Sequence, residues 1–314
     1  MEQIKSFEQF FQDELELSLQ NLEAERQRFS WMLPLGLTLL IGMGILLLAA
    51  ANAGGAIIIL PVLGFLAGCI LLGIFASQKG DFVKKFKREI VQKIIHFVNP
   101  SFAYYPDNCI NEADYDKSGL FLQRTSRYNG DDYIEGTLDK TTFCFSELHT
   151  QRKVDNGKTT SYETIFRGLF FIADFNKNFH GRTYAWSTRN RQLNFFNKIF
   201  SSFAWNLEKV VLESPDFAER FVVYSNDQVE ARYILTPSFM ERLMRLQQLL
   251  GDGTAVSFVD TNIYVAIPVR DELFEPTIFH GNSFETVQDY YTTVQVVIDI
   301  INELKLNQRI WNKD

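Results

Sequence analysis

The sequence predicts an α+β protein with a two-helix transmembrane hairpin, an amphipathic helical stalk and a cytoplasmic domain of mainly antiparallel sheet plus helices. Between Arg28 and Lys79 the chain has no Asp, Glu, Lys or Arg, and beyond residue 100 short strand-like runs replace the helical period. Strands in series, without regular alternation with helices, favour an antiparallel sheet. Four segments are expected: an acidic amphipathic cytoplasmic helix (1–28), the transmembrane hairpin (29–78), a basic amphipathic stalk helix (79–99) and a soluble cytoplasmic α+β domain (100–314).

The uncharged run predicts two membrane spans. It is more than twice the ~20 residues that one helix needs to cross a bilayer, and Asn52-Ala53-Gly54-Gly55 interrupts it. Helices over 31–51 and 56–76 fit this pattern. A buried hairpin of a soluble protein is the alternative, but the length disfavours it. The acidic residues before the run argue against a cleaved signal peptide, whose first region is basic.

The flanking charges predict the orientation of the hairpin, because Lys and Arg beside a span are retained in the cytoplasm. Basic residues stand on both sides of the hairpin, namely Arg26, Arg28, Lys79, Lys84, Lys85, Lys87 and Arg88. Both termini are therefore expected in the cytoplasm. The connection over 52–55 carries no charge, so the protein presents almost nothing to the other side.

Two amphipathic helices are expected next to the spans. Apolar residues recur every three or four positions at Ile4, Phe7, Phe11, Leu15, Leu19 and Leu22, and again at Phe82, Phe86, Ile90, Ile94 and Val98. The first polar face is acidic and the second is basic, so we predict that the helices pair side by side as a stalk. The competing interpretation is that the basic helix lies on anionic lipid.

The remaining chain predicts strands over 133–138, 141–148, 164–175 and 183–186, with a hairpin turn at Asn156-Gly157. Residues 169–175 are apolar on both faces, which is typical of a central strand. Extended runs are expected at 221–224 and 230–235, a helix from Thr236-Pro237 to Gly251, a hairpin of 256–259 with 263–267, and a long helix from Ser283.

Residues that could carry chemistry are scattered. The histidines are His96, His149, His180 and His280, and none lies in a metal-binding or zinc-protease motif. Gly251-Asp252-Gly253 lacks the lysine of a phosphate-binding loop and is interpreted as a turn. The three cysteines, Cys69, Cys109 and Cys144, have no redox or zinc spacing and are expected to be reduced. No catalytic, cofactor-binding or metal-binding residue is therefore predicted.

Charge and small residues bear on partners. The net charge is −7, with no basic stripe outside the segment next to the membrane, so nucleic acid is not expected as a partner. Gly64 and Gly68 form a small-xxx-small pattern in the second span. Two interpretations stay open, packing against the first span, which offers Gly36, Gly42 and Gly44, and a contact between copies in a homo-oligomer.

Three stretches resemble a bacterial family of membrane proteins of unknown function. They are FSELH at 145–149, FRGLFFIADFNK at 166–177 with GRT at 181–183, and YSNDQVEARYILTP at 224–237. The resemblance implies two N-terminal spans, a cytoplasmic domain and a bacterial inner (plasma) membrane. Members are often encoded beside LemA-type membrane proteins, which implies a partner of that type. The family has no established activity, so the resemblance assigns no catalytic residue.

These observations favour a membrane-anchored cytoplasmic interaction or scaffold module, in contact with the lipid bilayer and a membrane-protein partner. The alternative is a membrane-bound enzyme or carrier that acts on a lipid or a cytoplasmic small molecule. Its site would lie between the strands around His149 and His180. A pocket with perturbed titratable groups would favour the alternative.

Overall fold

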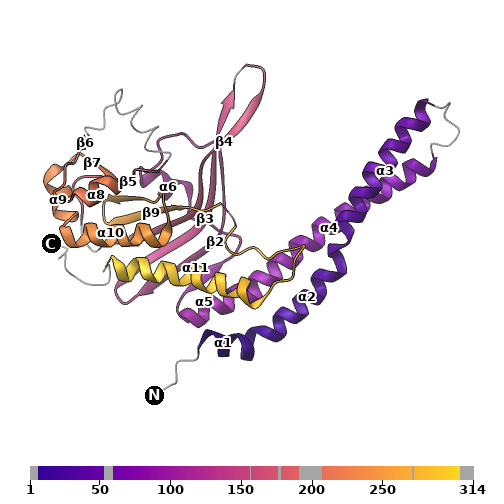
Figure 1. The fold of residues 1–314 in the computed structure, drawn as a ribbon, viewed down its shortest axis with the longest axis horizontal. Helices are drawn as coiled ribbons and strands as arrows, with labels where there is room; N and C mark the ends of the chain where they lie inside the picture. Colours follow the sequence, from indigo (N-terminus) through magenta and orange to yellow (C-terminus); the bar gives the residue numbers. More distant parts are fainter. Residues whose placement is uncertain are drawn as a thin grey trace. The chain divides into compact units, whose positions relative to one another are not determined.

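The computed structural model describes residues 6–52, 59–155, 157–175, 178–190, 207–270 and 272–304 (Figure 1). Its contacts divide the chain into two units. The anchor unit comprises Met1–Phe97 and Phe274–Tyr290, and the sheet unit comprises Val98–Leu273 and Tyr291–Asp314. The segment Phe274–Tyr290 thus groups with the N-terminal helices, although the sequence alone suggested one domain from residue 100 onward.

Helices make up the anchor unit. In chain order they are α1 (Phe7–Phe10), the π-helical η1 (Phe11–Leu15), α2 (Glu16–Ser30), α3 (Met32–Asn52), α4 (Ile59–Phe86), the π-helical η2 (Lys87–Val91), α5 (Gln92–Val98) and the first part of α11 (Phe284–Glu303). Ser6 begins α1 with a capping box, in which its side chain accepts a hydrogen bond from the backbone of Gln9 and the Gln9 side chain accepts one from Ser6.

Helices α3 and α4 are long and apolar enough to cross a membrane. They expose large apolar side chains along their length, with Ile41 64%, Leu48 72% and Ile59 76% exposed. A hairpin in the core of a soluble protein would bury such residues. The two expected spans agree with these helices, and residues 53–55 of the predicted turn lie outside the described residues. Helix α4 continues without a break through residue 79, where the stalk was expected to begin.

Glycines lie at the contact between α3 and α4. A Cβ added to Gly36 would lie 2.7 Å from Leu72 Cδ2, and one added to Gly64 would lie 2.7 Å from Met43 Cγ. A Cβ on Gly68 would lie 3.1 Å from the carbonyl oxygen of Gly36. These glycines let the two backbones approach closely, which supports the interpretation of packing between the spans.

The predicted pairing of the two amphipathic helices is present in the anchor unit. Lys85 Nζ lies 2.6 Å from Glu25 Oε2, and Lys93 Nζ donates to the Glu14 carbonyl oxygen at 3.1 Å. The Phe29 and Phe82 rings lie 5.6 Å apart. The apolar residues expected in the seam are buried, with Leu15, Leu22, Phe82, Phe86, Ile90 and Ile94 at most 1% exposed.

The sequence did not predict that Phe274–Tyr290 adds a third component to this stalk. The Phe284 ring lies 4.9 Å from that of Phe11, and the Tyr290 ring lies 6.0 Å from that of Phe86. Arg26 donates to the Ile278 carbonyl oxygen at 2.6 Å. The segment therefore covers apolar rings of the stalk and accepts a hydrogen bond from Arg26, groups that a helix pair alone would leave exposed.

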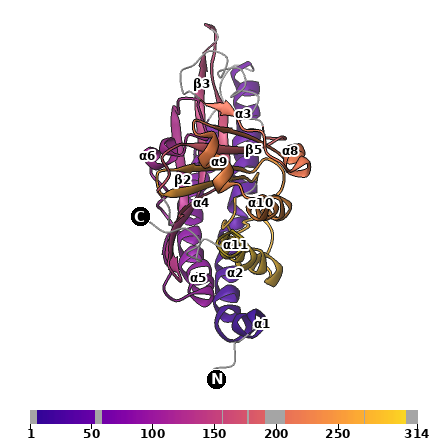
Figure 2. The same ribbon diagram turned by 90° about the vertical axis from the view of Figure 1, so that its left-hand side faces the viewer.

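Within the described residues, the sheet unit forms one nine-stranded antiparallel sheet with the order β1-β2-β3-β4-β9-β8-β5-β7-β6 (Figures 1 and 2). The strands are β1 (Ala103–Tyr105), β2 (Arg127–Leu138), β3 (Thr141–Asp155), β4 (Thr160–Asp174), β5 (Thr183–Ser187), β6 (Glu208–Lys209), β7 (Phe221–Ser225), β8 (Ala255–Val259) and β9 (Asn262–Pro268). The helices in the described part of this unit are α6 (Glu112–Lys117), α8 (Pro215–Arg220), α9 (Gln228–Ile234), α10 (Pro237–Leu250) and the remainder of α11.

Strand β4 is central and buried on both faces, as the sequence predicts. Phe170 and Phe171 point to opposite faces, and both are 0% exposed. On one face Tyr115 of α6 lies 5.4 Å from Phe170, measured between ring centroids. On the other face the Phe143 ring lies 6.1 Å from Phe171. The abundant phenylalanines are thus largely a packed core.

One expected strand is wrong. Residues 230–235 fall mostly in helix α9, because Asp227 caps this segment through hydrogen bonds from the backbone N–H groups of Val229 (2.9 Å) and Glu230 (2.8 Å). Helix α10 has the predicted Thr236 cap and ends at Gly251. On α11, the buried side chains include Val287, Tyr290, Val294 and Val297.

Candidate functional site

A pocket of about 910 Å³ lies in the sheet unit at the base of a β-ribbon. The last pair of β2 with β3 is Arg127↔Gln151, and the last pair of β9 with β4 is Pro268↔Gly168. Beyond these pairs β3 and β4 continue alone as a two-stranded ribbon, visible above the sheet in Figure 1. The pocket volume is within the ~300–1,000 Å³ range of small-molecule sites.

A β-bulge shapes this pocket. Thr150 pairs with Phe166 and Gln151 pairs with Thr164, so Ile165 is an extra residue on β4. A bulge bends its strand and redirects side chains. Ile165 is 6% exposed and lines the pocket. The sequence predicted a regular strand from 164, because a bulge leaves no periodic signature in one apolar run.

Apolar side chains form the floor of the pocket. Phe121 is 8% exposed and Phe166 is 4% exposed, and their ring centroids lie 5.0 Å apart. Ala266 of β9 adds to this surface. Aromatic rings at this spacing offer a face on which a flat or aliphatic ligand can pack.

Charged side chains line the rim. Arg152 lies 2.5 Å from Glu163, and Arg189 pairs with Asp252. Arg167 lies 3.5 Å from Glu272, a residue that does not line the pocket. The lining contains Arg152, Arg167, Arg189 and Arg270 against Glu163 and Asp252. Positive charge is therefore in excess. Asp252 belongs to the Gly251-Asp252-Gly253 segment, which is a turn as predicted.

One polar atom in the lining residues is unsatisfied. Gln123 Oε1 is buried and has no hydrogen-bond partner among the described residues. Buried polar groups normally have a partner, so such an atom indicates a bound water or ligand group that donates. An amide oxygen accepts hydrogen bonds, for example from a hydroxyl.

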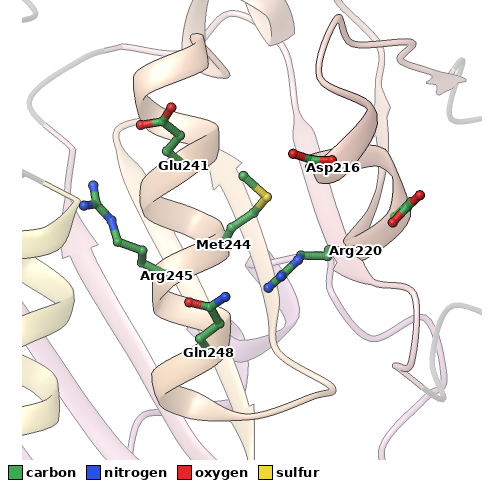
Figure 3. Close-up of a pocket in the computed structure, with 7 residues that line it drawn as sticks. Asp216, Arg220, Glu241, Met244, Arg245 and Gln248 are labelled. Carbon is green, nitrogen blue, oxygen red and sulfur yellow. The ribbon is translucent and has the colours of Figure 1, made fainter.

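A second, smaller pocket of about 360 Å³ lies between α8 and α10 (Figure 3). Asp216 and Arg220 come from α8. Met244 comes from α10 and points toward α8, as Figure 3 shows. Arg245 points away toward α11, where its Nε lies 2.8 Å from Glu303 Oε1. The pocket is shallow and its charges nearly balance, so it is a groove between helices rather than a strong binding site.

Three carboxyl groups gather on β2 and β3. One oxygen each from Asp131, Asp132 and Glu147 lies within 4.8 Å of the others. Tyr104 donates a hydrogen bond to Asp132, and the Leu273 backbone N–H donates to Glu147 Oε2 at 2.9 Å. Burial raises the pKa of Glu147 to about 7, and the carboxylates of Asp131 and Asp132 act in the same direction. An all-oxygen ligand set suits Mg²⁺ or Ca²⁺. Here, however, Asp132 already accepts a hydrogen bond from Tyr104, and Glu147 accepts one from the Leu273 N–H.

The two histidines considered for a site do not converge. His149 lies on β3 opposite Arg167, and His180 precedes β5. Strands β4, β9 and β8 lie between β3 and β5. With about 4.8 Å between neighbouring strands, this separation is roughly 19 Å. Burial and the charge of Arg167 lower the pKa of His149, whose Nε2 lies 3.1 Å from Thr164 Oγ1. An enzyme site that joins His149 with His180 is therefore not supported.

Comparisons with known proteins agree with part of the predicted resemblance. The model of a family described as a protein of unknown function (DUF3137) matches residues 164–306, slightly less than half of the chain. No curated protein matches the chain. Among solved structures, the chain is similar to the crystal structure of the mycobacterial trehalose monomycolate transport factor A, TtfA, with 8% identity and a TM-score of 0.33. That match covers 70% of this chain and 96% of the other. It is too weak to bear on function. The family match includes β4 and β9, which line the 910 Å³ pocket.

Proposed function

We propose that the chain is a membrane-anchored interaction module of a bacterial inner membrane, with both termini in the cytoplasm. The observation that carries this proposal is the continuity of the anchor unit. Helices α3 and α4 expose apolar side chains along their length. The start of α3 and the end of α4 are continuous with the stalk helices, which carry the basic residues. Basic residues beside spans favour the cytoplasmic side.

Chain connectivity supports a module rather than a loose tail. The chain passes between the two units after Phe97, after Leu273 and after Tyr290. In sequence, residues 98–273 of the sheet unit thus lie between the two segments of the anchor unit, and residues 291–314 follow the second. The two units are therefore joined at three points of the chain.

Reporter fusions test the orientation. Fusions at residue 1 and residue 314 should both give a cytoplasmic signal, and one inserted at Gly54 should give an external signal. An external signal from either terminus would contradict the orientation. The Gly54 insertion is the control that shows the reporter can detect the outside.

The proposed partner is a membrane protein of the LemA type. A second copy of this chain is the other candidate partner. Affinity purification of the full chain in mild detergent should yield one stoichiometric protein partner. A copurifying small molecule or lipid without a protein partner would instead favour a carrier. The 910 Å³ pocket is the specific observation that favours this second function.

A further inference from the structure

The pocket at the base of the β-ribbon has a charged rim and an apolar floor in the same concavity. We propose that it binds a small organic anion, a phosphate or carboxylate joined to an aromatic or aliphatic body. This inference does not depend on the proposed membrane orientation or on a protein partner, since each lining residue belongs to the sheet unit.

Arg270 is the least engaged arginine of the pocket lining. It is exposed, and among the described residues it has no ion-pair partner. Arg152 and Arg189 flank the pocket but are engaged by Glu163 and Asp252. An uncommitted guanidinium with two further arginines nearby favours a phosphate or carboxylate, which it binds through paired N–H donors.

The floor determines the rest of the ligand. Phe121, Phe166 and Ile165 are nearly buried and lie below the rim. Inorganic phosphate would leave this apolar surface unfilled, whereas a cation would be repelled by the excess of arginines. A ligand with both parts removes apolar area from water and keeps its charge at the rim. The unsatisfied Gln123 Oε1 adds an acceptor for a ligand hydroxyl or a bridging water.

Backbone constraints hold the walls in position. Gly253 has φ +109°, and a Cβ there would lie 3.3 Å from Pro268 Cγ. Both residues line the pocket. There is little room for a side chain between Gly253 and the Pro268 ring, so this part of the wall is closely packed and should lose little conformational freedom on binding.

Calorimetric titration of the full chain in phosphatidylcholine nanodiscs tests the proposal, with naphthyl phosphate as the probe. Naphthol lacks the anion and inorganic phosphate lacks the body, so each should bind at least about tenfold more weakly than naphthyl phosphate. Equal binding of naphthol and naphthyl phosphate would overturn the proposal, because the rim would then contribute nothing.

Variants of exposed residues give changes of opposite sign without disturbing the core. Arg270→Ala should weaken binding of naphthyl phosphate by about tenfold. Glu163→Gln should tighten it, because it removes the negative charge opposite Arg152. Arg232→Ala, on the exposed side of α9, is the matched control and should leave binding unchanged. Equal effects of Arg270→Ala and Arg232→Ala would refute a specific anion site.

The anion can come from a soluble metabolite or from a lipid headgroup, and one further titration separates these sources. Phosphatidylglycerol in the nanodisc should compete with naphthyl phosphate if the pocket takes a lipid headgroup. Unchanged binding would identify a soluble anion. Either result supports the shared chemistry, provided that Arg270→Ala weakens binding in the same nanodisc.

Discussion

Gly168 on β4 is a residue whose side chain is excluded by the fold. Its φ is +145°, and a Cβ there would lie 2.1 Å from the carbonyl oxygen of Ile267. Gly168→Ala is therefore expected to lower the free energy of unfolding by about 2–5 kcal/mol, from backbone strain and overpacking. Thermal unfolding of the full chain in detergent measures this change.

Gly157 provides the matched control for Gly168. It also has a positive φ of +80°, but no atom lies within 4 Å of an added Cβ. Gly157→Ala should cost no more than about 1 kcal/mol. Equal losses at the two positions would show that the contact with Ile267 does not matter.

Glu147 makes stability depend on pH. Its pKa is raised from 4.5 to about 7, so between these values the folded chain keeps a proton that the unfolded chain has lost. The free energy of unfolding therefore falls as the pH rises through this window, by up to about 3 kcal/mol. Glu147→Gln keeps an acceptor for the Leu273 N–H and should be more stable than the wild type above pH 7, with no gain below pH 4.5.

The exposed Glu213 is the control for Glu147. Glu213→Gln removes the same charge at the surface, and its stability should follow that of the wild type across the pH range. A loss of stability in Glu147→Gln that is independent of pH would mean that the raised pKa is not the cause.

Single-residue features were the least accessible from the sequence. Glu147 lies in a plain strand pattern, and its proximity to Asp131 and Asp132 depends on the strand register and on a bulge in β2. Gly168 lies in a run of apolar residues that predicts a regular strand. Both features arise from contacts with another strand, which no local pattern encodes.

The stalk offers a test at the level of helices. Lys85 and Glu25 lie 45% and 38% exposed, and an exposed pair of this kind contributes only about 0.5 kcal/mol. The buried apolar seam should therefore hold the helices together, and cysteines at these two positions should crosslink within one chain in native membranes. Lipid photolabelling of this helix face without crosslinking would instead favour a helix that lies on the bilayer.

A control pair separates specific pairing from random collision. Leu17 is 72% exposed and lies eight residues before Glu25 on α2, which is roughly 12 Å along a helix. Cysteines at Leu17 and Lys85 should crosslink much less efficiently than those at Glu25 and Lys85. Similar yields for both pairs would contradict the observed register.

Elements with a strong local pattern could be predicted, and those without one could not. The uncharged run predicts the two spans, the apolar period predicts the stalk helices, and Thr236-Pro237 predicts the start of α10. The sequence predicts a strand over most of the short helix α9, because seven residues are too few to show a period and its Asp227 cap decides the conformation. Residues 274–283 have little local pattern, and the contacts of Phe274–Tyr290 with the stalk are long-range, so the sequence does not predict where this segment packs.

At the scale of the whole molecule, the strand order could not be read from the sequence. Strands β8 and β9 come late in the chain but pair between β4 and β5. This insertion separates His149 from His180 and joins the end of β9 to the ribbon, which creates the pocket. The sequence predicts most of the strands, although not β1 or β6, but the pocket depends on their order in the sheet.

The return of Phe274–Tyr290 to the stalk predicts how the domain behaves when it is freed from the membrane. A fragment from Pro100 onward should fold and unfold cooperatively, because it retains all nine strands of the sheet. In that fragment Phe284 and Tyr290 lose their partners Phe11 and Phe86. Chymotrypsin should therefore cut between residues 274 and 291 much faster in the fragment than in the full chain, while β3 and β4 stay protected in both. Equal cleavage rates would mean that the stalk does not hold this segment, and a fragment that aggregates under all conditions would show that the sheet unit needs the anchor unit to fold.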